Sequence, residues 1–138
     1  MNTKWLYWGA TVMLALMYVA GGVMYLTKTS MVQQMWGTLG YPAYLVPILG
    51  VVKLAGAITI LWRFSVALSD LAYVGMFFHL LLALSAHLNA GDLGFAPALV
   101  GLAALVASFF TQNSARRVPS PYGGSPTRTA TSDLKLAG

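Results

Sequence analysis

The sequence predicts an all-α integral membrane protein, a four-helix bundle with a disordered C-terminal tail. Of its 138 residues, 58% are hydrophobic and only 8% are charged, whereas soluble domains carry about 25% charged residues. The mean hydropathy is +0.71, and the apolar residues gather in four long runs. Most of the eight Lys and Arg residues stand near the ends of these runs, not on one polar face as in a nucleic-acid-binding domain. We therefore expect the lipid bilayer, and no nucleic acid, as the surrounding partner.

The four apolar runs have the lengths that membrane spans require. A helix needs about 20 apolar residues to cross about 30 Å of hydrocarbon. The runs are Trp5–Leu26, Tyr44–Trp62, Leu71–Leu88 and the shorter Phe95–Thr111. Pro47 and Pro97 fall near the starts of their helices, where a missing N–H costs little. A cleaved signal peptide is the competing interpretation of the first run, but it requires a shorter apolar core and a small-residue cleavage pattern that this run lacks.

The joints between the spans predict the topology. In the first joint, Thr27–Pro42, Met31, Met35 and Leu39 are spaced by four residues, so a short helix there would have one apolar face for the membrane interface. A capped loop is the alternative. The other joints, 63–70 and 89–94, are short, and short joints make successive helices antiparallel. We expect an up-down-up-down bundle.

Lys and Arg residues near the span ends predict the orientation. One side collects Lys4, Arg63, Arg116 and Arg117, with Arg128 and Lys135 farther along the tail, and the other side collects Lys28. We therefore expect both termini to be cytoplasmic. Residues 112–138 are rich in Ser, Thr, Pro and Gly and carry too little apolar surface to fold. The domain organisation that follows is a four-span domain over residues 1–111 and a disordered cytoplasmic tail over residues 112–138.

Lys53 is the strongest functional signal in the sequence. An ionisable group at the centre of a span costs about 2.5 to 3.5 kcal/mol on insertion scales. Lys53 has nine residues of its span on either side, which is about 13 Å of helix and beyond the reach of a snorkelling lysine. We expect its side chain to face the bundle interior and to serve a bound group.

Two further polar residues are expected at the depth of Lys53. His79 lies in the middle of the third span, and Tyr18 lies slightly past the middle of the first. No carboxylate is available at this depth, because Asp70 opens the third span nine residues before His79 and projects from the opposite face of the helix. Lys53 is therefore either neutral or hydrogen-bonded to an anionic or carbonyl-bearing ligand.

The two histidines do not form a metal site by themselves. His79 and His87 are eight residues apart, about 12 Å along a helix, which is too far to bind one metal ion. We expect no haem, because a lone histidine in an apolar span is more often a hydrogen-bonded interior residue. His87 is close in depth to Tyr41, Tyr44 and Asp92, and this group forms either the mouth of a pocket or a hydrated rim.

Several motifs resemble those of the DoxX-like family of small bacterial membrane proteins. They are Gly22–Lys28 (GVMYLTK), Leu39–Tyr44 (LGYPAY), Gly50–Ala57 (GVVKLAGA), Leu71–Gly75 (LAYVG), Ser85–His87 (SAH) and Gly91–Asp92. The resemblance covers residues 18–110 and implies a four-helix protein of the bacterial inner membrane. The wider superfamily includes a subunit of a thiosulfate:quinone oxidoreductase and components linked to thiol-redox defence, so it implies a quinone-facing redox role. Better-known members carry a Glu in the second span where this sequence has Lys53.

Three functions of different classes remain open. The first is an accessory or subunit of a membrane redox system that binds a quinone-like molecule, with Lys53 and His79 on its carbonyls, Tyr18 beside them and His87 at the mouth. Since the chain has no cysteine, electrons would pass through the bound quinone or a redox partner protein. The second is a scaffold for a larger complex, in which Lys53 pairs with a partner carboxylate. The third, a proton-coupled exporter, normally needs a membrane-embedded carboxylate. Whether the chain is an enzyme, and whether it forms a homo-oligomer, is left open.

Overall fold

The computed structural model describes residues 2–124 and contains five helices in this part of the chain. They are α1 (Thr3–Thr27), α2 (Thr29–Thr38), α3 (Leu45–Trp62), α4 (Val66–Ala90) and α5 (Phe95–Ala115). Within the described residues, four of them, all except α2, are long and apolar enough to cross a membrane. The predicted all-α four-span class is confirmed, and the segment between the first two spans is a helix and not a loop.

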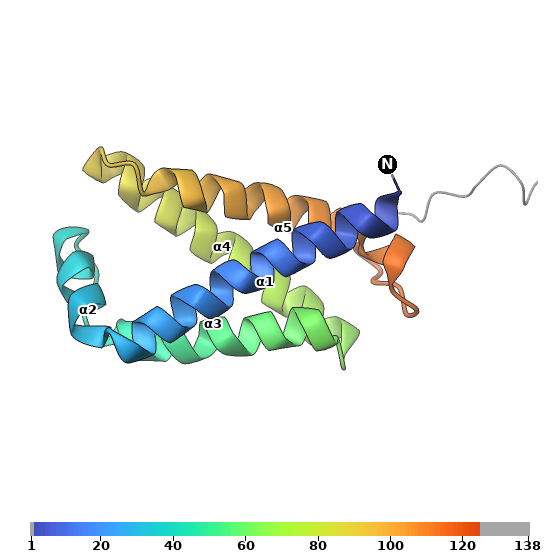
Figure 1. The fold of residues 1–138 in the computed structure, drawn as a ribbon, viewed down its shortest axis with the longest axis horizontal. Coiled ribbons are helices and arrows are strands. Elements are labelled where there is room, and N and C mark those ends of the chain that lie inside the picture. Colours follow the sequence, from blue (N-terminus) through green and yellow to red (C-terminus); the bar gives the residue numbers. More distant parts are fainter. Residues whose placement is uncertain (1, 125–138) are drawn as a thin grey trace, which may run out of the picture.

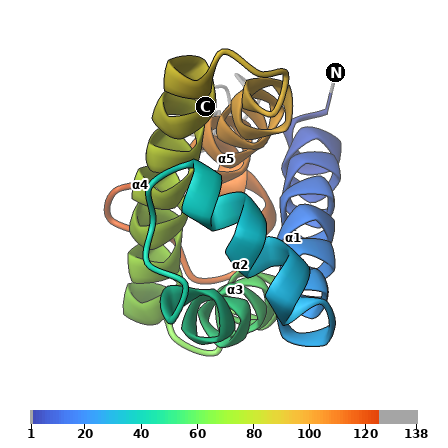
Figure 2. The same cartoon turned by 90° about the vertical axis from the view of Figure 1, so that its left-hand side faces the viewer.

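Figure 1 shows α1 running diagonally across the molecule, with α5 on one side of it and α3 on the other. Seen from the end, the four long helices surround a common interior, with α1 and α4 on opposite sides and α2 lying across the end of the bundle (Figure 2). Helix α1 packs closely on α3 and α5, and α4 packs on α5. Helices α3 and α4 diverge from the turn that joins them, so their mutual packing is looser (Figure 1).

Local sequence signals set the ends of the helices. The Asn2 side chain accepts a hydrogen bond from Lys4 N at 3.1 Å and caps α1, and Ser65 accepts from Leu68 N at 3.3 Å and caps α4. Gly91 ends α4 with a φ of 70°, a left-handed conformation that glycine adopts without a steric penalty.

Close packing between α1 and α3 depends on two glycines. Gly22 and Gly50 are buried at this seam, where an added Cβ on Gly22 would lie 2.9 Å from Leu54 Cγ and 3.0 Å from the Gly50 carbonyl oxygen. In lipid, helices associate largely through such close approach of small residues and through hydrogen bonds between helices. The bundle therefore holds together most tightly along α1.

A buried set of hydroxyl groups joins three of the spans. Ser108 Oγ of α5 lies 2.6 Å from Thr11 Oγ1 of α1 and 2.6 Å from Tyr73 Oη of α4. Thr11 and Ser108 are fully buried and Tyr73 nearly so, and a buried hydroxyl group is costly without a partner. This network fixes α1, α4 and α5 relative to one another on the side of the bundle away from α2.

Residues after the predicted fourth span extend the folded part of the chain. Helix α5 continues past Thr111 to Ala115, and the next residues fold back against the end of the bundle. Arg116 donates to Tyr7 Oη at 2.6 Å and to two carbonyls at the end of α3, while Ser120 donates to Asp70 Oδ2 at 2.8 Å. The predicted tail thus begins with ordered contacts over residues 112–124, and its remainder, 125–138, lies outside the described residues.

Candidate functional site

Lys53 lies at the middle of α3 and directs its ammonium group toward α1. The Nζ atom is 5.0 Å from the centre of the Tyr18 ring and 4.8 Å from that of the Tyr25 ring, distances at which a cation is attracted to an aromatic face. The side chain passes beside Gly21 of α1, where a Cβ would be in contact with Nζ at 3.4 Å. Among residues 2–124, the Nζ atom makes no hydrogen bond, and the ion pair found there, His87–Asp92, does not involve it.

Tyr18 and His79 connect α1 to α4 across the interior. Tyr18 Oη lies 2.9 Å from His79 Nδ1 and 3.2 Å from the Met76 carbonyl oxygen. The hydroxyl has one hydrogen, so it donates either to the carbonyl or to the ring nitrogen. In the first case it accepts from Nδ1–H and leaves His79 Nε2 as an acceptor, and in the second it leaves Nε2–H as a donor. His79 Nε2 can therefore act either as a hydrogen-bond acceptor or as a hydrogen-bond donor toward a bound molecule.

Lys53, Tyr18 and His79 line one cavity of about 390 Å³. The rest of its wall comes from α3 and α4 and is apolar except for Thr59. The cavity occupies the space between these two loosely packed helices and is partly open to their outer surface. The three residues that the sequence placed at one depth are thus brought to one site, which has the form of a small-molecule pocket: mostly apolar, with a few convergent polar groups.

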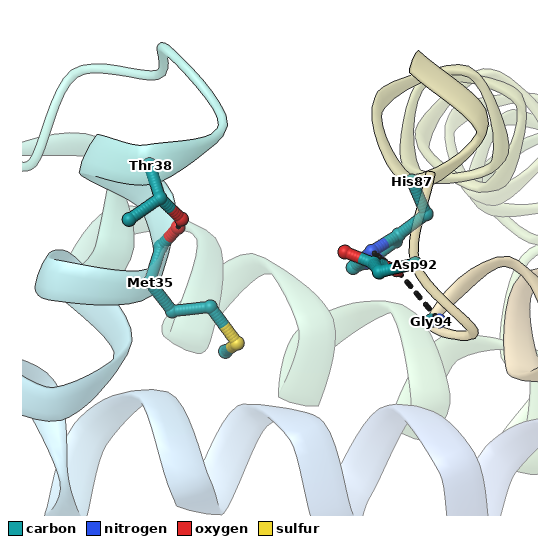
Figure 3. Close-up of polar contacts among 5 residues, drawn as sticks. All are labelled: Met35, Thr38, His87, Asp92 and Gly94. Atoms are coloured by element: carbon teal, nitrogen blue, oxygen red, sulfur yellow. Dashed lines mark hydrogen bonds and ion pairs between the residues drawn. The ribbon is translucent and has the colours of Figure 1, made fainter. Parts of the chain in front are cut away.

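His87 lies farther along α4, at the end of the molecule covered by α2. Its Nδ1 is 2.7 Å from Asp92 Oδ1, and the same oxygen accepts from Gly94 N at 2.7 Å. Figure 3 shows this group in the turn between α4 and α5, at the same end of the molecule as Met35 and Thr38 of α2. His87 does not line the cavity of Lys53. It lines a second cavity, of about 370 Å³, together with His79 and Tyr41.

The chemistry of the site is that of hydrogen bonding to a small polar group in an apolar setting. The ammonium of Lys53 supplies hydrogen-bond donors only. His79 supplies one ring nitrogen, which donates or accepts according to the tautomer of the ring. The described residues contain no cluster of three or more His, Cys, Asp or Glu side chains that could hold a metal ion. His79 and His87 stand two turns apart on α4, so they do not converge on one ion.

The comparison with protein families supplies the identity of the fold. The sequence model of one family, described as the DoxX-like family, matches residues 9–110. The chain belongs to the DoxX-like family. The match includes Tyr18, Lys53, His79 and His87, so the whole candidate site lies within the family domain. Searches of curated proteins and of solved structures each found no match for this DoxX-like protein.

Sequence reasoning missed one contributor to the site. Tyr25 is at the end of the first span, a position typical of interface tyrosines, yet its ring lies against Lys53 Nζ. The available signal was its spacing, because Thr11, Tyr18 and Tyr25 recur every seven residues and share one face of α1. In this DoxX-like protein that face is turned to the interior of the bundle, where Thr11 contacts α5, Tyr18 contacts α4 and Tyr25 lies against Lys53 of α3.

Proposed function

We propose that this DoxX-like membrane protein binds a quinone-like molecule between α1, α3 and α4, as an accessory or subunit of a membrane redox system. The observation that carries the proposal is Lys53, whose ammonium lines an apolar cavity at mid-span without an oxygen acceptor among the described residues. A charged or donor group buried in an apolar medium costs several kcal/mol unless it is hydrogen-bonded. A carbonyl oxygen placed in the cavity would supply that acceptor.

The shape of the cavity favours a neutral, apolar carbonyl compound. At about 390 Å³ the cavity falls near the lower end of the range for small-molecule sites, about 300 to 1,000 Å³. Its walls are apolar apart from the three site residues and Thr59, and its open side lies between two helices that face lipid. A ring with carbonyl oxygens would set one oxygen near Lys53 and His79, and an apolar tail would pass between α3 and α4 into the bilayer.

The experiment compares the small molecules that co-purify with the full chain in mild detergent. Mass spectrometry is run on the wild type, on Lys53→Met and on the matched control Lys28→Met, which removes an exposed lysine at the end of α1. We expect a quinone or a related carbonyl lipid with the wild type and the control, and its loss with Lys53→Met. The circular dichroism of each variant confirms that the bundle is folded.

Other results of the same experiment refute the proposal. Retention of the molecule by Lys53→Met would show that Lys53 does not bind it. A protein partner without any small molecule, shed by Lys53→Met, would assign Lys53 to an interface and favour the scaffold function. Since the chain has no cysteine, electrons for any redox step would have to come from a partner protein or from the bound quinone, and co-purification also reports that partner.

We further propose that the protein resides in the bacterial inner membrane with both termini in the cytoplasm. Lys4, Arg63 and Arg116 lie at the end of the bundle opposite α2 (Figure 1), and basic residues are enriched on the cytoplasmic side. Because the native chain lacks cysteine, Thr38→Cys and Pro119→Cys can be labelled singly with an impermeant maleimide. We expect labelling of Thr38→Cys on intact cells and of Pro119→Cys after permeabilisation only. The reverse pattern would invert the topology.

A further inference from the structure

The second cavity adjoins the candidate ligand site and extends toward the end of the molecule that carries α2. It is lined by residues of α1, α2, α3, α4 and the α2–α3 joint, and its volume is about 370 Å³. His79, Leu49 and Gly75 line both cavities, so the two are neighbours and His79 is common to them. The other histidine on its wall, His87, is two turns away toward the end of the bundle, about 12 Å along the helix.

The turn between α4 and α5 holds His87 in one orientation. Asp92 Oδ1 accepts from Gly94 N and lies 2.7 Å from His87 Nδ1, while Asp92 N donates to the His87 carbonyl oxygen at 3.2 Å. A Cβ on Gly94 would overlap the His87 ring. The absence of a side chain at Gly94 therefore makes room for the contact between His87 and Asp92. An ionised carboxylate only accepts hydrogen bonds. The hydrogen of the short contact is therefore on Nδ1, and Nε2 is the nitrogen free to exchange a proton with water.

The pair lies at one end of the membrane-spanning helices, where we expect the aqueous phase. The side chains of His87 and Asp92 are 23% and 48% exposed. The other titratable groups on the wall around His87 are Tyr25 of α1 and Tyr41 of the α2–α3 joint. At the inner end, His79 faces Tyr18 of α1 and Lys53 of α3. In the described part of the chain, Asp92 is the only carboxylate at this end of the bundle, since Asp70 lies at the other.

The second cavity has the volume to hold water, and its mostly apolar, partly open wall carries a few polar groups. At about 30 Å³ for each molecule, 370 Å³ corresponds to on the order of ten waters. Ordered waters need about two to four polar partners each, and five ring groups on the wall can act as such partners. These are Tyr25, Trp36, Tyr41, His79 and His87. A chain of a few waters, each about 2.8 Å from the next, covers the distance between the two histidines.

We propose that the second cavity is a hydrated proton path from the aqueous phase on the α2 side to the ligand site, with His87 and Asp92 as the exchanging pair at its mouth. The inference rests on the proposed function, because a quinone-like ligand takes up or releases protons when it changes redox state. A proton from bulk water binds His87 Nε2, Asp92 stabilises the imidazolium, and the proton leaves to the cavity water and reaches His79. The ligand enters from lipid between α3 and α4, and protons enter from water by a separate route.

The first test follows water at His79 in the full chain, freed of bound small molecules and placed in lipid nanodiscs. The chain has two histidines, so ¹⁵N-histidine labelling gives two sets of ring signals, which His87→Gln assigns. Water-edited NMR then measures the transfer of magnetisation from water to each ring. We expect transfer to His79 in the wild type. Its absence there would overturn the proposal.

Cavity-filling variants identify the route of that water. Ala83 lines the second cavity and Ala55 the first, so Ala83→Leu fills one and Ala55→Leu fills the other. We expect Ala83→Leu to abolish the transfer to His79 and Ala55→Leu to retain it. The opposite pattern would mean that water reaches His79 between α3 and α4, and the proposed path would be wrong. Ala86→Leu, at a second position in the same cavity, is used if Ala83→Leu does not fold.

The pair at the mouth is tested by the rate of proton exchange at the His79 ring. His87→Gln and Asp92→Asn keep the side-chain sizes but remove the exchanging nitrogen or its carboxylate. We expect both to slow exchange while the water contact of His79 persists, and the exposed control Asn89→Gln to have no effect. Unchanged exchange in both variants would remove His87 and Asp92 from the path. Because these samples hold no ligand, the result is independent of whether Lys53 retains a quinone.

Discussion

Replacing Gly22 by alanine tests whether the seam between α1 and α3 depends on the absence of a side chain. The added Cβ would lie 2.9 Å from Leu54 Cγ and Cδ2 and 3.0 Å from the Gly50 carbonyl oxygen. The leucine can move, but the carbonyl belongs to the backbone of α3, so the two helices have to separate. Overpacking of this kind costs about 1 to 3 kcal/mol, and alanine regains about 1 kcal/mol in helix propensity.

Gly9→Ala is the matched control on the same helix, because a Cβ at this exposed position has no atom within 4 Å. It gains the helix propensity without a clash. We therefore expect a net loss of about 1 kcal/mol for Gly22→Ala and a gain of up to about 1 kcal/mol for Gly9→Ala. The free energy of unfolding is measured for both full chains in mixed detergent and SDS micelles by circular dichroism. Equal stability of the two variants would show that α1 and α3 do not approach as closely as described.

Three further substitutions probe polar contacts, each by the same unfolding measurement. Ser108→Ala removes the hydroxyl that bridges α1 and α4 and should lower the free energy of unfolding by about 1 kcal/mol. Thr59→Ala, whose hydroxyl bonds a carbonyl of its own helix, should change it little. Equal effects of the two substitutions would contradict the role of the bridge. Arg116→Gln removes three hydrogen bonds to α1 and α3 and should lower the free energy of unfolding by about 2 kcal/mol. Arg117→Gln, at an exposed position, should leave it unchanged. Gln112→Met replaces a buried amide whose atoms have no partner among the described residues and should raise stability; a loss would refute that expectation.

The depth of the candidate site could be predicted from the sequence because membrane thickness fixes where the middle of each span lies. Lys53, His79 and Tyr18 are central in their apolar runs, and the structure brings them to one cavity. Their side-chain partners could not be predicted in this way. The contact between Tyr18 and His79 depends on how α1 and α4 are rotated about their axes, and nearly uniform apolar helices carry little information about rotation.

Helix boundaries were predicted less well where polar residues are buried. The apolar run of the third span starts at Leu71, but α4 starts at Val66, because Ser69 and Asp70 interrupt the run while lying inside the protein. Asp70 is bonded by Ser120, a residue from the segment that the composition assigned to the tail. A contact between positions so far apart in the chain leaves no trace in local hydropathy, so both the early start of α4 and the packing of residues 116–124 were beyond prediction.

The divergence of α3 and α4 has a consequence for how the affinity of this protein for a small-molecule ligand should be measured. The opening between them is apolar and faces the acyl chains, which are present in a bilayer at the concentration of a solvent. The proposed ligand of the first cavity would therefore compete with lipid chains, and its apparent affinity would be a ratio of two occupancies. Chain length and unsaturation of the host lipid, or the alkyl chain of a detergent, should shift the measured value as strongly as many substitutions in the site would.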